Sequence, residues 1–588
     1  MKALYQSILS DFAHIDLKRK YEINVENREL PEIKGVGPSA IRVALNRKIP
    51  SDKLRNFFNP EIVSYLPSSD SIPDLDKAAS VIVDGIMTGK KFGLVGDYDV
   101  DGATSVSEMV IFLRDAGVPN GLMEFYIPQR LTEGYGLNNN AIRQLYDNGS
   151  RILIVLDSGT LSNEPLAYAD ELGMSIIVVD HHMPGEAWVK PHGLLVNPQL
   201  GKFEDLKNLC TAGLVFLLLQ KVRELLNKAG YTNIPSLIKL SGLASLGTVA
   251  DLMTLVGLNR ALVAQGIPHL DDVLGLSALV SRVAGKIGER AKVNTRTLGF
   301  GVGPCINAAG RISDCMKGSQ LLTSENSYEA TDMANELFEI NKERQDMQRK
   351  IEASAIEMAI EQADDTASVI IVRNEEWHPG VIGIIASRIM NMLDRPSLVI
   401  GEGGKGSGRS IQGFDLGTAI IQARNNGLIY KGGGHALACG LTVDPDKYDE
   451  FFAFMKEKTK DIIRLPHRAD LVLPLHQLTV SLVRDLESLA PFGQGNPEPR
   501  IILTDCMITG HKWIGKNSGF NHLRLMLESN GVRYGAVYFS AKDTLKGDFL
   551  SGNIQEKRVS LVVSVSLNLD FPSNPIDIKI SDIVEQIN

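Results

Sequence analysis

The sequence has few cysteines that could form disulfides or bind zinc, and it has no apolar run long enough to cross a membrane. Its 588 residues include five cysteines, an odd number with no CxxC pair, so neither a zinc ribbon nor a disulfide framework is expected. No apolar run approaches the roughly 20 residues that span a bilayer. Residues 1–20 have no signal-peptide core, because Asp11, His14 and Asp16 interrupt them. These absences predict a cytoplasmic protein with reduced thiols and no membrane contact.

Positive charge is also in short supply. The net charge of −9 argues against a protein that coats nucleic acid over its whole surface, although a local basic channel is compatible with it. The composition, 44% hydrophobic and 22% charged, is ordinary for a globular chain. A chain of 588 residues is too long to fold around a single hydrophobic core, so several domains are expected.

Strand and helix patterns alternate in the first half of the chain. The β-rich runs Phe92–Val95, Arg151–Leu156 and Ser175–Val179 are separated by helical segments, which predicts a parallel α/β sheet. Each run is followed at once, or after one residue, by an aspartate. Because ligands bind beyond the carboxyl ends of parallel strands, the strand order itself predicts one site. Asp251 follows a more helical stretch, residues 238–249, and its placement is left open.

The second half predicts two further domains. Residues 327–363 form a long helical pattern whose charges are read as a solvated face rather than a nucleic-acid contact. A smaller α/β unit follows, with strands at Ala367–Val372 and Pro396–Ile400 and two glycine-rich loops, 406–410 and 432–435. Short strands between turns then predict a small barrel or sandwich. The predicted boundaries are 1–75 for an N-terminal extension packing on the catalytic domain, 76–325 for the catalytic domain, 326–363 for a connecting helix, 364–462 for the second α/β domain and 463–588 for the last domain.

Acids and histidines cluster at the strand ends. Asp97 and Asp99 alternate in Gly96-Asp97-Tyr98-Asp99-Val100-Asp101-Gly102, and could face one pair of metal ions. Asp101 is counted with the catalytic residues, and it or Thr104 could cap the following helix. By itself such a turn is as compatible with a surface loop. A calcium loop of the EF-hand type is excluded, because no Glu occupies its twelfth position.

Two adjacent histidines are the more specific signal, since histidine is scarce in this chain. His181 is a candidate metal ligand, and His182 a candidate contact to a scissile phosphate. Asp180 could orient an imidazole. Asp157 could bridge two metals, although Asp-Ser-Gly is also ordinary turn chemistry. Carboxylates and imidazoles without cysteine suit Mg²⁺ or Mn²⁺, and a pair of such ions activates water for phosphoryl transfer.

Candidate phosphate contacts lie further along the chain. Arg130 and Arg311 could clamp phosphate through their guanidinium groups, against the simpler reading of surface ion pairs. The loop with Ser407 and Arg409 combines close backbone approach with a hydroxyl and a charge. The loop with Gly433, Gly434 and His435 adds backbone donors.

In combination these motifs resemble the DHH phosphoesterase superfamily. The ordered motifs DYDVDG, DSG, DHH and TVAD carry that resemblance. The stretches YIPQRLTEGYGLN, INAAGR, WHPGVIGIIASR, GSGRSIQGFDL, GGGHALACG and PFGQGNPEP resemble, within it, the RecJ family of single-strand-specific 5′→3′ DNA exonucleases. The match runs from about residue 45 to 500.

The resemblance implies a specific architecture and chemistry. It implies a parallel-sheet DHH catalytic domain, a long connecting helix, a smaller α/β DHH-associated domain and a C-terminal OB-like β-barrel. It implies two Mn²⁺ or Mg²⁺ ions on Asp97, Asp99, Asp157, His181 and Asp251. A 5′-phosphate pocket would draw on Arg130, Arg311, Ser407 and Arg409. A single DNA strand would enter 5′ end first and be released as mononucleotides, in DNA repair and recombination.

The resemblance also suggests partners and leaves alternatives. A single-strand-binding protein and a helicase are expected partners of a monomer, in the cytoplasm of a cell or, for a viral protein, of its host. Two departures from the family pattern stand out, Ser158 in place of Asn and Cys305 in place of Arg. The alternatives are a phosphodiesterase for oligonucleotides or cyclic dinucleotides, and a DNA-binding replisome scaffold without turnover.

Overall fold

The structure is a computed structural model. It describes residues 21–23, 30–68, 71–130, 132–134, 136–185, 188–285, 293–363, 368–460, 462, 467–515, 522–539, 541, 547, 550–551, 558–568 and 574–584. Residues 1–20, the predicted strand start at Ala367 and the predicted domain boundary at 463 lie outside this part. Among the described helices none is both long and apolar enough to cross a membrane.

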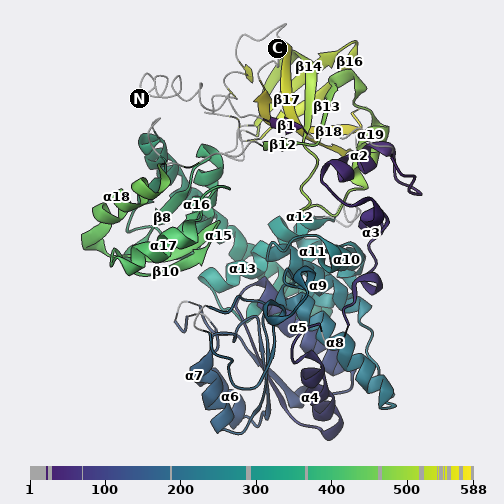
Figure 1. The fold of residues 1–588 in the computed structure, drawn as a ribbon, viewed down its shortest axis with the longest axis vertical. Coiled ribbons are helices and arrows are strands. Elements are labelled where there is room, and N and C mark those ends of the chain that lie inside the picture. The colour runs from purple at the N-terminus through teal and green to yellow at the C-terminus, as the bar shows by residue number, and fades with distance from the viewer. Residues whose placement is uncertain are drawn as a thin grey trace. The chain divides into compact units, whose positions relative to one another are not determined.

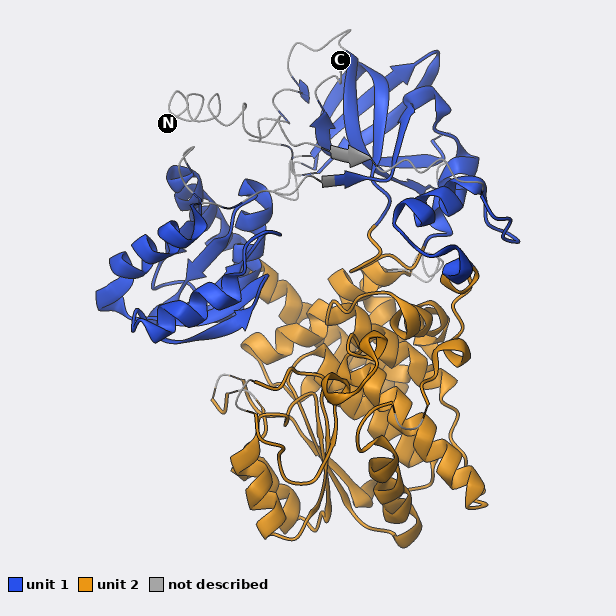
Figure 2. Ribbon diagram, viewed as in Figure 1, with its two compact units in different colours: residues 1–54, 347–489, 498–588 blue, residues 55–346, 490–497 orange. Residues whose placement is uncertain are grey.

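The chain divides into two compact units, coloured in Figure 2. Unit 2 comprises residues 55–346 and 490–497, and unit 1 comprises residues 1–54, 347–489 and 498–588. Each unit is described by itself below.

Unit 2 is built on a parallel five-stranded sheet in the order β3-β2-β4-β5-β6. The strands are β2 (Phe92–Gly96), β3 (Met123–Tyr126), β4 (Ile152–Leu156), β5 (Ser175–Val179) and β6 (Leu194–Val196). The register aligns the last residues of β2, β4 and β5 with one another. Asp97, Asp157 and Asp180 therefore leave the sheet side by side. The prediction of a parallel sheet with acids at its carboxyl edge is confirmed.

Both faces of this sheet are covered by helices, as Figure 1 shows. Leu94 and Ile154 point into the larger core with α4 (Leu75–Thr88), α5 (Val100–Asp115) and α8 (Thr211–Lys228). Val95 and Val155 point the opposite way, toward α6 (Asn139–Asp147) and α7 (Asn163–Glu171). The alternation is the period-two geometry of a strand, and burial on both faces explains why the strands read as continuous apolar runs.

The rest of unit 2 is helical. Its α-helices are α9 (Ser241–Ala250), α10 (Gly257–Gly266), α11 (Leu274–Ala284), α12 (Thr295–Thr297), α13 (Gly303–Ile312) and α14 (Lys317–Thr323). A π-helical turn, η9 (Leu298–Val302), joins α12 to α13. The helix α3 (Leu54–Phe58) precedes these elements in the sequence. Short 3₁₀ turns are η2 (Ile62–Tyr65), η3 (Asn120–Leu122), η4 (Pro198–Leu200), η5 (Glu204–Leu206), η6 (Ile238–Leu240) and η7 (Ile267–Asp272). The predicted long helix is confirmed as α15 (Ser327–Gln362), which continues from unit 2 into unit 1.

Unit 1 contains the predicted second α/β sheet, in the order β10-β11-β9-β8-β7. Its strands are β7 (Ile370–Arg373), β8 (Ser397–Ile400), β9 (Lys405–Arg409), β10 (Ile429–His435) and β11 (Ala438–Val443). Its helices are α16 (Pro379–Leu393), α17 (Leu416–Asn425) and α18 (Tyr448–Thr459), with 3₁₀ turns η10 (Glu402–Gly404) and η11 (Pro445–Lys447). Ile370 and Val399 pack toward α16, whereas Ile371 and Leu398 pack toward α17 and α18.

The prediction that the two glycine-rich segments are loops is wrong. Residues 405–409 form β9 and residues 429–435 form β10, both joined to β11 through antiparallel pairing. Glycine is needed in these strands because the neighbouring chain lies close. A Cβ at Gly408 would sit 2.6 Å from Cys439 Sγ, and one at Gly434, whose φ is +153°, would sit 2.3 Å from Ala438 O. Turn propensity alone does not reveal such cross-strand crowding.

The C-terminal strands close into a barrel. The strands of this sheet are β13 (Leu471–Pro474), β14 (Ile501–Ile514), β15 (His522–Ser529), β16 (Val532–Tyr538), β17 (Arg558–Leu567) and β18 (Ile576–Val584). The preceding strand β12 (His467–Ala469) belongs to a separate two-stranded sheet. The pairing runs β14-β15-β16-β18-β17, and β14 also pairs with β17, which completes the ring; β13 adds to β14. The predicted small barrel is confirmed. η12 (Leu475–Gln477) and α19 (Val480–Glu487) complete this part.

Two segments link distant parts of the sequence. In unit 1, β1 (Tyr21–Ile23) pairs with β12. The helix α2 (Pro38–Asn46), which the turn η1 (Ser51–Lys53) follows, packs on α19, where Asp485 accepts the Ser39 amide at 2.8 Å. In unit 2, residues 490–497 dock on the helices. The guanidinium of Arg260 donates to Pro491 O at 3.1 Å and to Ala490 O at 2.7 Å.

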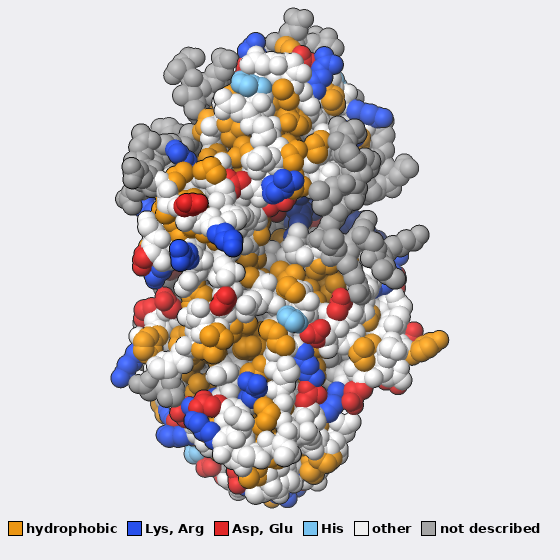
Figure 3. Space-filling view, turned by 90° about the vertical axis from the view of Figure 1, so that its right-hand side faces the viewer, with side chains coloured by type: hydrophobic (Ala, Val, Ile, Leu, Met, Phe, Trp, Pro, Cys, Tyr) orange, Lys and Arg blue, Asp and Glu red, His pale blue; other side chains and the backbone are white. Residues whose placement is uncertain are grey.

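The surface carries charges of both signs, and the cysteines lie in the interior. On the face drawn in Figure 3, acidic and basic side chains are interspersed among apolar ones. All five cysteines are buried and free, as predicted for reduced thiols.

Candidate metal centre and phosphate pocket

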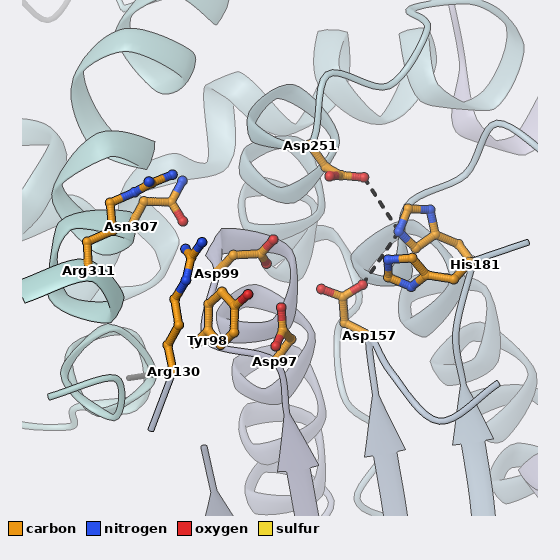
Figure 4. A pocket seen from close by; sticks show the side chains of 10 residues that line it. Asp97, Tyr98, Asp99, Arg130, Asp157, His181, Asp251, Asn307 and Arg311 are labelled. Atoms are coloured by element: carbon orange, nitrogen blue, oxygen red, sulfur yellow. Dashed lines mark ion pairs between the residues drawn. The ribbon is translucent and has the colours of Figure 1, made fainter. Parts of the chain in front are cut away.

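A cavity of about 230 Å³ opens at the carboxyl edge of the unit 2 sheet. It is lined by Asp97, Tyr98, Asp99, Arg130, Asp157, His181, His182, Asp251, Asn307 and Arg311. Figure 4 shows the carboxylates of Asp97, Asp99, Asp157 and Asp251 converging with His181, while the two arginines lie together on the opposite side. The structure thus brings together all five predicted metal ligands, His182, Arg130 and Arg311.

The loop after β2 turns directly into α5. Asp99 is the N-cap of this helix and accepts the amides of Asp101 at 2.9 Å and Gly102 at 3.1 Å. The expectation that Asp101 or Thr104 is the cap is wrong, because the helix begins two residues earlier than the sequence suggested. A Cβ at Gly102 would lie 2.3 Å from Asp97 O, so only glycine lets the loop fold back so closely.

Asp101 instead anchors a second helix. Its two carboxylate oxygens accept the amides of Thr211 at 2.7 Å and Ala212 at 2.9 Å, at the start of α8. It is 1% exposed, does not line the cavity, and lies 3.9 Å from His181 Nε2. Two amides at a helix N-terminus stabilise its negative charge. This geometry makes Asp101 a positioning residue; a part in the chemistry remains a prediction.

Asp157 lies at the centre of the carboxylate group. It adopts a left-handed backbone conformation with φ +63°, which is uncommon for a residue with a side chain. Thr211 Oγ1 donates to its Oδ1 at 3.0 Å, and His181 Nε2 lies 3.5 Å from the same oxygen. Backbone strain of this kind concentrates at functional sites. Leu252, next to Asp251, shows the same feature with φ +56°.

The ligand atoms fall into overlapping groups, each within 4.8 Å. The groups are Asp97 with Asp99 and Asp157, Asp157 with His181 and His182, and Asp101 with His181 and Asp251. Asp157 and His181 each belong to two of the groups. Asp251 follows the end of α9, and its Oδ2 lies 3.6 Å from His181 Nε2.

The acids carry strongly perturbed pKa values. Burial, followed by the Asp99 charge, raises the pKa of Asp97 to about 8. Burial, followed by the Asp101 and Asp99 charges, raises the pKa of Asp251 to about 8. Burial also raises the pKa of Asp157 well above its ordinary value and lowers that of His181. Crowded carboxylates of this kind favour a bound cation, which would remove their mutual repulsion.

His182 differs from His181 in its partner. Its Nδ1 lies 2.7 Å from Asp180 Oδ1, which matches the orienting role predicted for Asp180. Burial opposes a charged imidazole, but the Asp180 hydrogen bond and charge outweigh it and raise the pKa of His182 to about 9. Burial of Asp180 is outweighed in turn by His182 and Thr160, so its pKa is lowered. The Asp180 contact therefore favours the protonated form of His182.

Sequence reasoning missed the residues that hold the histidine pair. Asn197, fully buried after β6, donates to His182 O at 3.0 Å and to Thr160 Oγ1 at 2.9 Å. Gln199 donates to His181 O at 3.1 Å. Asn197 follows a short strand at the same sheet edge as the acids. That edge placement is the one sequence signal that could have pointed to it.

The predicted phosphate arginines lie on the far side of the carboxylates. The Arg130 guanidinium stacks 4.7 Å above the ring of Tyr98, and Arg311 comes from α13. Tyr98 and Asn307 also line the cavity but were not predicted as site residues. Stacking on a ring fixes the plane of the Arg130 guanidinium, a group whose planar fork of donors suits an anion.

Cys305, the residue that departs from the pattern expected from the resemblance, does not line this cavity. It is 1% exposed, and Asn341 Nδ2 of α15 lies 3.6 Å from its Sγ. Arg344, itself 7% exposed, donates to Asn341 Oδ1 at 3.0 Å. Cys305 therefore belongs to the contact between α13 and α15.

The other predicted phosphate contacts lie together in unit 1. Arg409 Nη1 donates to Ser407 Oγ at 3.1 Å, both on β9. On the neighbouring strands Arg409 pairs with Ala438, and Ala438 with His435. Gly433 borders open space, whereas Gly434 is in close contact with β11. Burial lowers the pKa of Arg409, although the group stays a cation at any physiological pH.

Three family profiles match the chain. They are the DHH family N-terminal domain over residues 91–248, the DHHA1 domain over 366–461 and the RecJ OB domain over 469–573. The first contains the predicted ligands except Asp251, and the second contains β7 to β11. The third covers most of the closed barrel.

Individual relatives agree with these profiles. The chain is 31% identical to the single-stranded-DNA-specific exonuclease RecJ of Escherichia coli, over 87% of this chain and 91% of that protein. It is 32% identical to the Bacillus subtilis protein of the same name, over 84% of this chain but only 61% of the relative. The crystal structure of RecJ from Thermus thermophilus in complex with Mn²⁺ superposes with a TM-score of 0.78 and 26% identity, covering 97% of this chain and 80% of that one.

Proposed function

The chain belongs to the RecJ family of single-stranded-DNA-specific exonucleases, and we propose that it hydrolyses single-stranded DNA from the 5′ end and releases 5′ mononucleotides. The observation that carries the proposal is the convergence of Asp97, Asp99, Asp157, His181 and Asp251 on one cavity. That set is complete, which argues against the alternative of a scaffold without turnover. The RecJ OB profile argues against a phosphodiesterase for dinucleotides, because such small substrates do not need an added barrel.

The donor set fits two divalent ions, Mn²⁺ or Mg²⁺. Asp97 Oδ1 and Asp251 Oδ2 are buried and accept no hydrogen bond from the described residues. Leaving buried carboxylate oxygens unpaired costs about 1–3 kcal/mol or more each, which a cation would recover. Asp97, Asp99, Asp157, His181 and Asp251 would hold the ions. When bound, the ions supply activation of a water molecule and neutralisation of charge on the phosphoryl oxygens.

The protein's own residues position the substrate around that centre. Arg130 and Arg311 bind phosphate oxygens, with Tyr98 fixing the direction of Arg130. His182 holds a proton on its imidazole through Asp180 and offers a positive charge to the scissile phosphate. Charge of this kind, fixed in place before the reaction, stabilises the transition state. Asp101 keeps α8, and with it Thr211, against Asp157.

Residues of unit 1 complete the proposal. Ser407 and Arg409 of β9 bind the 5′-phosphate, and Gly433, Gly434 and His435 offer backbone and imidazole donors to the strand. The barrel binds the single strand by stacking and charge. We further propose a monomer that acts in DNA repair and recombination in the cytoplasm, with a single-strand-binding protein and a helicase as partners. The domain boundaries at 75, 325, 363 and 462 belong to the same proposal.

The decisive experiment combines direction, substrate and metal. Wild-type protein is incubated with 5′- and 3′-labelled single strands and duplexes, with Mn²⁺ or with EDTA. Mononucleotides released first from the 5′ label of the single strand, with Mn²⁺ alone, are the expected result. Asp157→Ala should abolish release while retaining strand binding. Asp147→Ala, at a half-exposed acid of α6, is the matched control and should retain activity. Full activity of the Asp157 variant would refute the assignment.

A further inference from the structure

A row of solvent-accessible side chains leads out of the cavity along α12, η9 and α13. The positions recur every three or four residues and are Arg296, Phe300, Pro304, Asn307 and Arg311. Asn307 and Arg311, at one end, line the cavity. Buried residues such as Leu298, Val302 and Ile306 hold the opposite side of the same segment against the core. The row is therefore a continuous surface that begins at the proposed phosphate pocket.

Phe300 is the unusual member of this row. Its side chain is 81% exposed, although it is aromatic and sits on a well-packed segment. It lies in the π-helical turn η9, a local geometry that often marks functional sites. The turn is held from both sides, since a Cβ at Gly301 would lie 2.4 Å from Val283 Cγ1 and one at Gly299 would lie 3.3 Å from Val249 Cγ1. An exposed ring is thus presented by a backbone that has little room to move.

The neighbours of Phe300 favour nucleic acid over an apolar partner. The row starts with Arg296 and ends with Arg311, so the ring lies between two cations with no acid among the five positions. An aromatic face combined with cations is how proteins bind single strands without sequence preference. Phe300 is eleven residues from Arg311, which corresponds to about 16 Å along a helix. That distance holds up to about five nucleotides at a stacked rise of about 3.4 Å.

We propose that Phe300 is a stacking platform for one nucleobase of the single strand, a few nucleotides from the phosphate bound at Arg311. This inference rests on the proposed function, because it assumes that the single DNA strand enters the cavity. It adds a residue that positions the strand through a base, whereas the metal ligands and arginines act on phosphates. A base that must leave its complement to stack there would also disfavour duplex.

The test measures binding, so that it does not depend on turnover. Phe300→Ala is made in the Asp157→Ala background, and a 3′-labelled 12-nucleotide strand is titrated with each protein by fluorescence anisotropy. Loss of one stacked base should raise Kd about tenfold. Phe300→Trp should restore affinity. Tyr328→Ala removes an equally exposed aromatic side chain, 82% exposed on α15, and should leave Kd unchanged.

An abasic scan identifies the stacked nucleotide and separates stacking from a structural role. Single abasic sites are placed at positions one to six from the 5′ end. One position should weaken binding to the Phe300 protein, and the same site should have no effect in Phe300→Ala. A flat scan, or an unchanged Kd in Phe300→Ala, would overturn the inference. If the wild-type protein binds with this pattern but releases no nucleotide, the proposed function fails and the platform stands.

Discussion

Asp97→Asn should stabilise the metal-free protein while destroying its activity. Asp97 is 4% exposed, and burial together with Asp99 raises its pKa to about 8, from an ordinary value of 3.8. At neutral pH the folded metal-free protein therefore keeps this carboxyl protonated, whereas the unfolded chain ionises it. Asn replaces the protonated acid with a neutral group of nearly the same shape and removes that difference between the two states.

The magnitude follows from the linkage between protonation and folding. Below pH 3.8 the Asp97 carboxyl is protonated in both states, so its raised pKa does not change the free energy of unfolding. As pH rises from 3.8 to about 8 the raised pKa lowers the free energy of unfolding progressively, and above about 8 the loss is constant. At about 1.36 kcal/mol per pH unit, the free energy of unfolding at pH 7 is lowered by roughly 4 kcal/mol at most. Relaxation of the site and its coupling to Asp99 reduce this, so a gain of about 1–4 kcal/mol is expected for the variant.

The assay is calorimetric unfolding in EDTA at pH 5, 7 and 8.5. The transition temperature of Asp97→Asn should exceed that of wild type, and the difference should widen from pH 5 to pH 8.5. Mn²⁺ should raise the transition of wild type more than that of the variant, because the variant has lost a ligand. Asp147→Asn controls for loss of a surface charge. A variant less stable than wild type in EDTA, or a difference independent of pH, would refute the reasoning.

Three further predictions concern other parts of unit 2. Asp180→Asn removes the carboxylate that lies 2.7 Å from His182 and raises the pKa of that histidine to about 9. The alkaline limb of the pH profile of kcat/KM should therefore move about two pH units lower. An unmoved limb would exclude His182 as the charged group. Arg130→Ala removes a phosphate contact and should weaken strand binding, whereas Tyr98→Phe keeps the stacked ring and should preserve binding, as competition assays would show. Arg260 is 2% exposed, and its guanidinium donates to the carbonyls of Phe57, Ala490 and Pro491. Arg260→Ala should lower the free energy of unfolding, measured by urea titration, by roughly 3 kcal/mol. Limited proteolysis of the variant should then cut residues 490–497 first.

Much of the fold was readable from local pattern. β4 is a continuous run of buried aliphatic residues, and β5 is one after its exposed first residue. The strand Ser175–Val179 was predicted with both boundaries correct. The long helix α15 was predicted to within one residue of its end. The errors came where distant contacts decide. β9 looks like a loop in one dimension because its glycines make room for β11, which follows about thirty residues later, and the glycines of β10 make room for the same strand across a tight hairpin.

The sequence by itself determined which chemistry the protein can perform. Acids placed directly after parallel strands must meet at one edge of the sheet, so Asp97 and Asp157 were predictable from strand order alone. Tertiary structure decided the division of labour among them. Asp99 caps its own helix, Asp101 turns away to hold α8, and Asn197 supports the histidine pair from the residue after β6. These roles depend on which amides and carbonyls come within hydrogen-bonding distance, and only packing of the whole unit sets those distances.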